Sequence, residues 1–305
     1  MEKILATFKK LYAGEDKVKK HLTFSLLLII PAIMTALANI LQLIVDNKEA
    51  KTELIVILVA VAFLFILFIP VMIFLTGYTL KYINGRHKGE VGIPSVDWDC
   101  FAVGIKAIPF YLAWMFYVCT PMLIFIGVLI YMIVKATSGG DPISMICAFV
   151  AFIGALILFY IALIVYSPFY CHVYIKYAKT LTYSADLFNP LKPFQYMGMA
   201  FKDTMITCLK YLVVSLVFAF VVQIVNMIFC GIGMVFLFLG SMASALSFVG
   251  YTFGVLIISI GSIISMYGQM MVTFAYTDNL IEVHKEKIEP IENDALKYKD
   301  ERLDI

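Results

Sequence analysis

The chain has 305 residues, of which 62% are hydrophobic and only 14% are charged. Soluble globular proteins carry about a quarter charged residues, so this composition excludes a soluble domain and indicates a protein that resides mainly in lipid. The formal net charge of +2 is small, and we expect no nucleic-acid partner.

Five stretches of the chain contain no Asp, Glu, Lys or Arg: residues 22–45, 54–80, 107–134, 142–175 and 211–277. Each exceeds the roughly 20 apolar residues that cross a bilayer core, and the last is long enough to cross twice. We therefore predict an all-α polytopic membrane protein with six transmembrane helices. The last two should join near Gly240 or Ser241, and the other outer turns should lie near Asn47 and Gly139.

The basic residues are distributed unevenly between these stretches. Of the 23 Lys and Arg residues, only Lys48, Lys51 and Lys135 fall on the segments predicted to lie outside. By the positive-inside rule, the N- and C-termini are both predicted to be cytoplasmic. The first apolar stretch continues well past a sequence that resembles a signal-peptide cleavage site, so we expect this helix to be retained.

A recurring pattern precedes each predicted pair of crossings. An aromatic residue is followed eight positions later by a lysine at Tyr12 and Lys20, Trp98 and Lys106, and Phe194 and Lys202. This pattern predicts three helix pairs, each preceded by a cytoplasmic amphipathic surface helix, within one membrane domain covering 1–280. The candidate repeat units are 1–90, 91–187 and 188–280. The alternative is that Trp, Tyr and Lys gather at membrane interfaces in any case.

The two ends of the chain differ in character. Near the N-terminus, apolar residues occupy one helical face at Ile4, Leu5, Phe8, Leu11 and Tyr12, and lysines occupy the opposite face. Such a helix should lie in the headgroup plane and be attracted to anionic lipid. Residues 281–305 are polar and contain Pro290, so we predict a mobile cytoplasmic tail.

The apolar stretches hold no Asp, Glu, Lys or Arg, the charged side chains that mark ion paths. Their polar residues include five amides: Asn39, Gln42, Gln223, Asn226 and Gln269. Hydrogen bonds between helices, worth about 0.6–2 kcal/mol each, are the expected role. The alternative is an uncharged lining for a neutral or amphiphilic solute. We expect no catalytic residue, no metal site and no cofactor.

Small residues form a stripe on the last predicted helix. Gly250, Gly254, Gly261, Ser265 and Gly268 recur at helical spacing, and the first two form a GxxxG pair. Such a pair lets two helix backbones approach closely. The stripe is expected to face another helix of the same chain, and a homodimer contact is the alternative.

The cytoplasmic segment from Lys81 to Lys106 is the densest polar loop. It contains Arg86 and then Asp97-Trp98-Asp99, where Ser95 or Asp97 is positioned to cap a surface helix and Trp98 to anchor it. The alternative is that the two aspartates bind a cation, a cationic headgroup or a basic segment.

Several of these residues also carry a resemblance to a known family. The residues are Gly77-Tyr78, Arg86, Gly89, Pro94, Asp97-Trp98-Asp99, Gly104 and Lys106. With the hydropathy of the chain up to about residue 280, they resemble an uncharacterised prokaryotic integral membrane family, domain of unknown function 4013. The second repeat departs from the motif, with Pro193-Phe194-Gln195 in place of the acids and Trp. The resemblance implies the prokaryotic cytoplasmic membrane and no known activity.

A fainter likeness is to the membrane domains that accompany glycerophosphodiester phosphodiesterases, but the catalytic His and metal-binding acids of such an enzyme do not appear in the sequence. We therefore expect a non-enzymatic membrane protein that scaffolds or assists other membrane components. The alternatives are a permease-like carrier or transporter subunit for a neutral or amphiphilic solute, and an enzyme acting on lipid.

Overall fold

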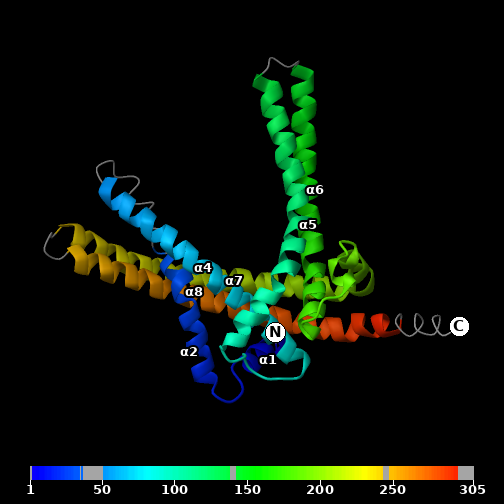
Figure 1. The fold of residues 1–305 in the computed structure, drawn as a ribbon, viewed down its shortest axis with the longest axis horizontal. Helices are drawn as coiled ribbons and strands as arrows, with labels where there is room; N and C mark the ends of the chain where they lie inside the picture. Colours follow the sequence, from blue (N-terminus) through cyan, green and yellow to red (C-terminus); the bar gives the residue numbers. More distant parts are fainter. Residues whose placement is uncertain (1, 35, 37–50, 138–141, 243–246, 295–305) are drawn as a thin grey trace. The chain divides into compact units, whose positions relative to one another are not determined.

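A computed structural model describes residues 2–34, 36, 51–137, 142–242 and 247–294 (Figure 1). The described part of the chain is helical and contains no β-strand. The helices are α1 (Glu2–Leu11), α2 (Lys17–Leu27), α4 (Lys51–His87), α5 (Trp98–Thr137), α6 (Pro142–Thr180), α7 (Lys192–Met242) and α8 (Ser247–Val283). A 3₁₀ helix covers Ala185–Phe188 and a π-helical turn covers His284–Ile288.

Four helical stretches within the described residues are long and apolar enough to cross a membrane. They are Ala62–His87, Trp98–Tyr117, Lys192–Gly240 and Thr252–Asp294. The long uncharged stretch 211–277 is divided between α7 and α8, which end and begin at Met242 and Ser247. This boundary lies within a few residues of the predicted junction.

The predicted surface helices have three different outcomes. The first is α1, which is a separate helix. The second is not separate, because α5 begins at Trp98 and continues to Thr137 as one helix. The third is marked by Ala200, whose non-helical φ of −136° and ψ of 28° break α7 after its first turns.

The polar segment after the second apolar stretch is shorter than predicted. Helix α4 continues to His87, so Arg86 lies in its last turn and not in a loop. The loop proper runs from Lys88 to Asp97. It is held to the N-terminal segment because Gly92, at φ +83°, donates its N–H to the carbonyl of Lys10 at 3.1 Å.

The chain divides into two compact units, each made of two segments. Unit 1 contains residues 1–105 and 207–279, and unit 2 contains residues 106–206 and 280–305. This division differs from the sequence repeats predicted above, and the repeats stay a prediction.

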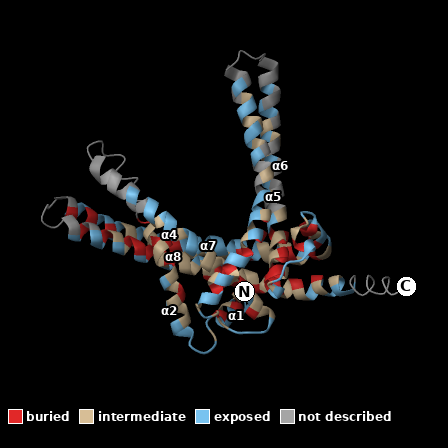
Figure 2. Cartoon of the chain, in the orientation of Figure 1, coloured by how far each residue is buried: buried red, intermediate tan, exposed pale blue. Residues whose placement is uncertain are grey.

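Each unit has its own cluster of buried aromatic side chains. Figure 2 colours the chain by burial, with buried residues in red. In unit 1, Phe24 stacks on Tyr78 with ring centroids 4.7 Å apart, and both lie near Phe274. In unit 2, Phe110 stacks on Tyr177 at 4.7 Å, and the buried Trp114 donates its Nε1–H to the carbonyl of Leu187.

The small-residue stripe of α8 faces α7, and the two helices lie side by side (Figure 1). A Cβ at Gly254 would lie 2.6 Å from Leu237 Cγ, and one at Gly261 would lie 2.7 Å from Phe229 Cβ. Gly250 and Gly268 likewise leave no room for a side chain, against Gly240 and Phe218. Ser265 in the same stripe is buried.

The C-terminal segment differs from the mobile tail that the sequence suggested. Helical structure continues through Pro290 to Asp294. Leu280, Ile281 and Ile288 are buried, so this part of the chain is packed within unit 2. Residues 295–305 lie outside the described part.

Candidate functional site

Asp97 is the N-cap of α5. Its Oδ1 accepts the backbone N–H of Cys100 at 3.2 Å, three residues into the helix, where a capping carboxylate satisfies an otherwise unpaired donor. The ammonium of Lys81 on α4 donates to both carboxylate oxygens at 2.8 Å. Ser95, the other candidate cap, donates its hydroxyl to Asp97 at 3.3 Å instead.

The electrostatics of Asp97 follow from these contacts. Partial burial alone would raise the pKa of this carboxyl, but the hydrogen bonds from Lys81 and Cys100 outweigh it and hold the pKa below its usual value. The Asp97 carboxylate is therefore ionised, and it is bound by the Lys81 ammonium and by the N-terminus of α5.

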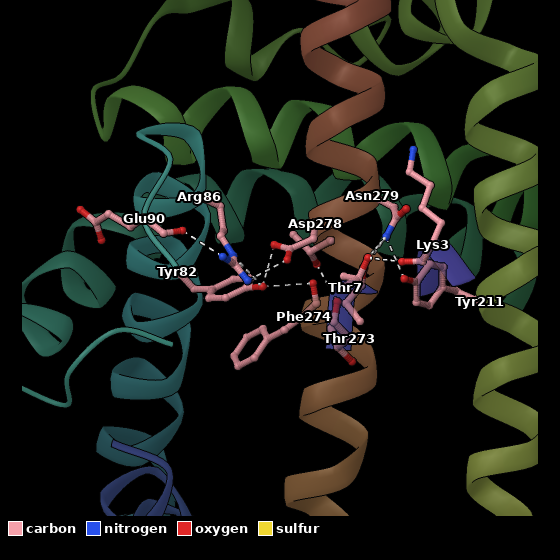
Figure 3. Close-up of polar contacts among 12 residues, drawn as sticks. Lys3, Thr7, Tyr82, Arg86, Glu90, Tyr211, Thr273, Phe274, Asp278 and Asn279 are labelled. Carbon is pink, nitrogen blue, oxygen red and sulfur yellow. Dashed lines mark hydrogen bonds and ion pairs between the residues drawn. The ribbon is translucent and has the colours of Figure 1, made fainter. Parts of the chain in front are cut away.

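The neighbouring residues of this motif are exposed. Trp98 is 82% exposed, and the Asp99 carboxylate lies 3.9 Å from Lys81 with its side chain in solvent. Arg86 is not part of the Asp97 arrangement. It extends from α4 toward α8, where it pairs with an acid of that helix (Figure 3).

That acid is Asp278, and together with Tyr82 the two residues form a buried cluster in unit 1. The Tyr82 hydroxyl donates to Asp278 Oδ1 at 2.6 Å, and Arg86 Nε donates to the Tyr82 oxygen at 3.2 Å (Figure 3). Arg86 Nη2 lies 2.9 Å from Asp278 Oδ2, an ion pair without the geometry of a linear hydrogen bond. The Arg86 and Asp278 side chains are only 9% and 10% exposed.

The cluster is fixed on both sides by further contacts. Tyr82 stacks on Phe274 at 4.3 Å, and Arg86 Nη1 donates to the carbonyl of Glu90. The adjacent Asn279 donates its amide to the Tyr211 hydroxyl at 2.8 Å and to Thr7 Oγ1 at 3.3 Å (Figure 3). One turn of α8 therefore connects α1, α4 and α7 through polar side chains.

Unit 2 contains a separate network of two lysines and two acids. Lys192 Nζ lies 2.9 Å from Asp186 and 3.1 Å from Glu292. Lys176 Nζ lies 3.2 Å and 2.9 Å from the same two acids. The Tyr196 hydroxyl also donates to Glu292 at 3.1 Å.

Hydrogen bonds from Lys192 are the main reason that the pKa of the Asp186 carboxyl lies below its usual value, and Lys176 adds to them. The two lysines and two acids neutralise one another, so the network offers no unpaired charge to a ligand.

A buried pair of histidines lies in the same unit. His172 Nε2 and the hydroxyl of Thr204 are 2.9 Å apart, and the His172 ring stacks on His284 with centroids 5.5 Å apart. Within the described residues, no three His, Cys, Asp or Glu side chains come together as a metal site would need.

The three amides that the structure describes, Gln223, Asn226 and Gln269, differ in exposure. Gln223 and Gln269 are exposed. Asn226 points its side-chain oxygen toward Gly261 of α8, and that oxygen accepts no hydrogen bond from any described residue. Asn39 and Gln42 lie outside the described residues.

Sequence reasoning missed the main charged clusters. Asp278 directly follows the last apolar stretch, Glu292 lies in the region expected to be a tail, and Tyr82 and Arg86 fell in a predicted loop. The signal that could have found Asp278 is its position directly after Thr277, still in helical register with Phe274.

Comparisons with protein-family models, curated proteins and solved structures found no match to this chain. The resemblance to domain of unknown function 4013 therefore stays a prediction.

Proposed function

We propose that the protein is a multi-pass membrane protein without an enzymatic reaction of its own, acting as a scaffold or accessory component in a prokaryotic cytoplasmic membrane. It would cross the bilayer six times as three helix pairs, with both termini in the cytoplasm. An apolar surface, and not a charged one, would then be available to lipid and to membrane partners, including a second copy of the chain.

The observation that carries the proposal is the separation of charge from exposed apolar surface. The ion pairs in the described residues are made outside the uncharged stretches, at Lys81, Arg86, Lys176 and Lys192 among others. Within an uncharged stretch, α7 exposes Leu216, Val217 and Phe220, each by more than 60%. Contiguous exposed apolar surface is the mark of contact with lipid or with another protein.

Topology is tested by single cysteines in a cysteine-free variant. A cysteine at Asn47, Gly139 or Ser241 should react with an impermeant thiol reagent added to intact cells, and one at Lys287 should react only after the cells are opened. Labelling at Lys287 from outside would contradict the six crossings.

The scaffold role is tested with a photo-crosslinking residue in native membranes. At the exposed Leu216 it should give one discrete protein adduct, and at the buried Val222 of the same helix it should give none. A permease-like carrier is the second candidate. Purified protein that releases neutral or amphiphilic solute from vesicles, with lipid adducts alone at Leu216, would replace the scaffold proposal with that one.

A further inference from the structure

Two cavities of unit 1 lie in line along one side of residues 17–33. The first, of about 520 Å³, is lined by Tyr12, Lys17, Val18, His21, Leu22 and Ser25. The second, of about 580 Å³, is lined by Ile29 and Ile33 together with six residues of α8. Both are open on one side, so each is a groove on the surface of the unit and not a closed void.

The two grooves are neighbours along the chain but are lined by different helices. The first is lined by Tyr12 and by α2 up to Ser25, and the second begins one turn later at Ile29 and is completed by α8. Along α8 the second groove runs from Thr252 to Ile263. One turn beyond it, the Tyr267 hydroxyl and His21 Nδ1 are 2.6 Å apart, beside the first groove. Helix α8 therefore lines the second groove with Thr252 to Ile263 and contacts the first groove through Tyr267 and His21.

The first groove has a polar mouth. Lys17 is exposed and makes no ion pair with any described residue. Tyr12 stacks on His21 with centroids 4.6 Å apart, which places a tyrosine hydroxyl beside the mouth. A lysine and a tyrosine are the side chains that membrane proteins place at headgroup level. The unpaired cation favours an anionic group here.

The second groove is mainly apolar, with Thr252 and Ser259 as its two polar lining residues. Its lining from α8 includes Val255, Leu256, Ile260 and Ile263. Ser259 also lines it, but the Ser259 hydroxyl donates to the carbonyl of Val255 at 2.8 Å and is thereby satisfied within its own helix. A hydrocarbon chain suits such a lining, because it requires no hydrogen bond and buries apolar surface.

The combined length matches one lipid molecule. From Lys17 to Ile33 the helical rise is about 24 Å at about 1.5 Å per residue. Half of a bilayer with its headgroups measures about 20–22 Å. A groove with a cationic end and an apolar end, and the length of one leaflet, is complementary to a phospholipid.

We infer that unit 1 binds one anionic phospholipid along residues 17–33 and α8, with its headgroup at Lys17 and Tyr12 and an acyl chain against Ile29 and Ile33. The inference rests on the membrane location proposed above, but not on a scaffold role. The site shares only Tyr12 with the predicted N-terminal amphipathic face, and its other residues follow α1 in the chain.

The test compares purified variants by native mass spectrometry after incubation in nanodiscs of equal parts phosphatidylglycerol and phosphatidylcholine. Wild-type protein should retain one phosphatidylglycerol per chain. Lys17→Glu should reduce this retention at least about fivefold, because it removes a direct hydrogen bond from the Lys17 ammonium to the anionic headgroup, and a hydrogen bond to a charged group contributes no less than that factor. Lys19→Glu, with the same charge change on an exposed side chain outside the groove, should match wild type.

A second pair of variants tests the acyl groove. Ile29→Trp should fill the groove and abolish retention of both lipids, whereas Leu26→Trp, at an exposed position outside it, should not. Equal losses from Lys17→Glu and Lys19→Glu would show a diffuse charge effect and overturn the site. Retention by Ile29→Trp, or none by wild type, would overturn it as well. The cysteine labelling of intact cells described above is independent of lipid retention, so the expected labelling pattern there would show that such a failure leaves the membrane proposal standing.

Discussion

Gly77 of α4 and Gly104 of α5 bring two helix backbones into direct contact. A Cβ at Gly77 would overlap the Cys100 carbonyl oxygen, and one at Gly104 would overlap the Ile73 carbonyl oxygen. No side chain can be inserted at either position unless the helices move apart. This crossing fixes the end of α4 that carries Lys81 and Arg86 against the start of α5.

Gly104→Ala should therefore lower the free energy of unfolding by about 1–3 kcal/mol, the usual cost of overpacking a close contact. Gly127→Ala on the same helix is the control, because a Cβ there meets nothing within 4 Å. It should be neutral or stabilising by up to about 1 kcal/mol. Thermal unfolding in detergent measures both, and equal melting temperatures would show that the two helices do not touch at Gly104.

The α7–α8 interface offers a second packing prediction. Gly254→Leu should push α8 from α7, because Leu237 Cγ and the Gly233 carbonyl oxygen lie 2.6 Å and 3.0 Å from the Cβ position. Gly231→Leu, where the space is open, should have little effect. A loss of several degrees in melting temperature is expected for the first variant only. Similar losses for both would mean that the close contact of Gly254 with α7 is not their cause, since Leu has a higher helix propensity than Gly at either position.

The Arg86–Asp278 pair predicts a large single-site effect. Asp278→Asn leaves Arg86 buried without its countercharge, which typically costs about 3–5 kcal/mol. The double variant Arg86→Met with Asp278→Leu removes both charges and should recover most of that loss, because apolar replacement of a buried pair is often neutral. Unfolding of Arg86→Met, Asp278→Leu and the double variant would measure the coupling. If the losses of unfolding free energy in the two single variants simply add up in the double variant, the two side chains do not interact.

Asp97 should give a pH-dependent effect. Because the pKa of its carboxyl is lowered in the folded protein, its contribution is present above the unfolded value near 3.9 and is lost as the pH falls through the folded value. Asp97→Asn should cost about 1 kcal/mol or less at pH 7, since Asn still caps a helix and a half-exposed ion pair contributes little. The difference from wild type should shrink below about pH 4. A constant difference down to pH 3 would exclude the ion pair as its cause.

The C-terminal helix should be required for unit 2. A stop codon after Val283 removes Glu292, which leaves the buried Lys192 with Asp186 as its remaining partner in the network. We expect a lower melting temperature and faster proteolysis within residues 106–206. A stop codon after Asp294 removes only residues outside the described part and is the control. If both truncated proteins melt and resist proteolysis like wild type, residues 284–294 do not stabilise unit 2.

Local patterns account for what the sequence could predict. The amphipathic face of residues 2–11, the cap at Asp97 and the small-residue stripe of α8 each follow from spacing within a single helix. These signals need only the period of a helix and the chemistry of its ends.

The remaining features depend on partners far apart in the chain. Tyr82 and Asp278 are separated by 196 residues, and neither position has a local signal that indicates the other. The contact of Gly77 with Gly104 depends on how two helices cross, which spacing within one helix does not determine. The helix through Pro290 forms against unit 2, where Ile288 is fully buried, so burial overrides a residue that alone predicts an end.

The interleaved arrangement of the two units also sets an order for biosynthesis. Unit 1 opens with residues 1–105 but is completed by 207–279, so the ribosome must first deliver most of unit 2. At about 5–20 residues per second, the 196 residues between Tyr82 and Asp278 take about 10–40 s to synthesise. Throughout that interval the Arg86 guanidinium has no carboxylate from α8. Water, lipid headgroups or the insertion machinery must solvate it until the end of α8 emerges.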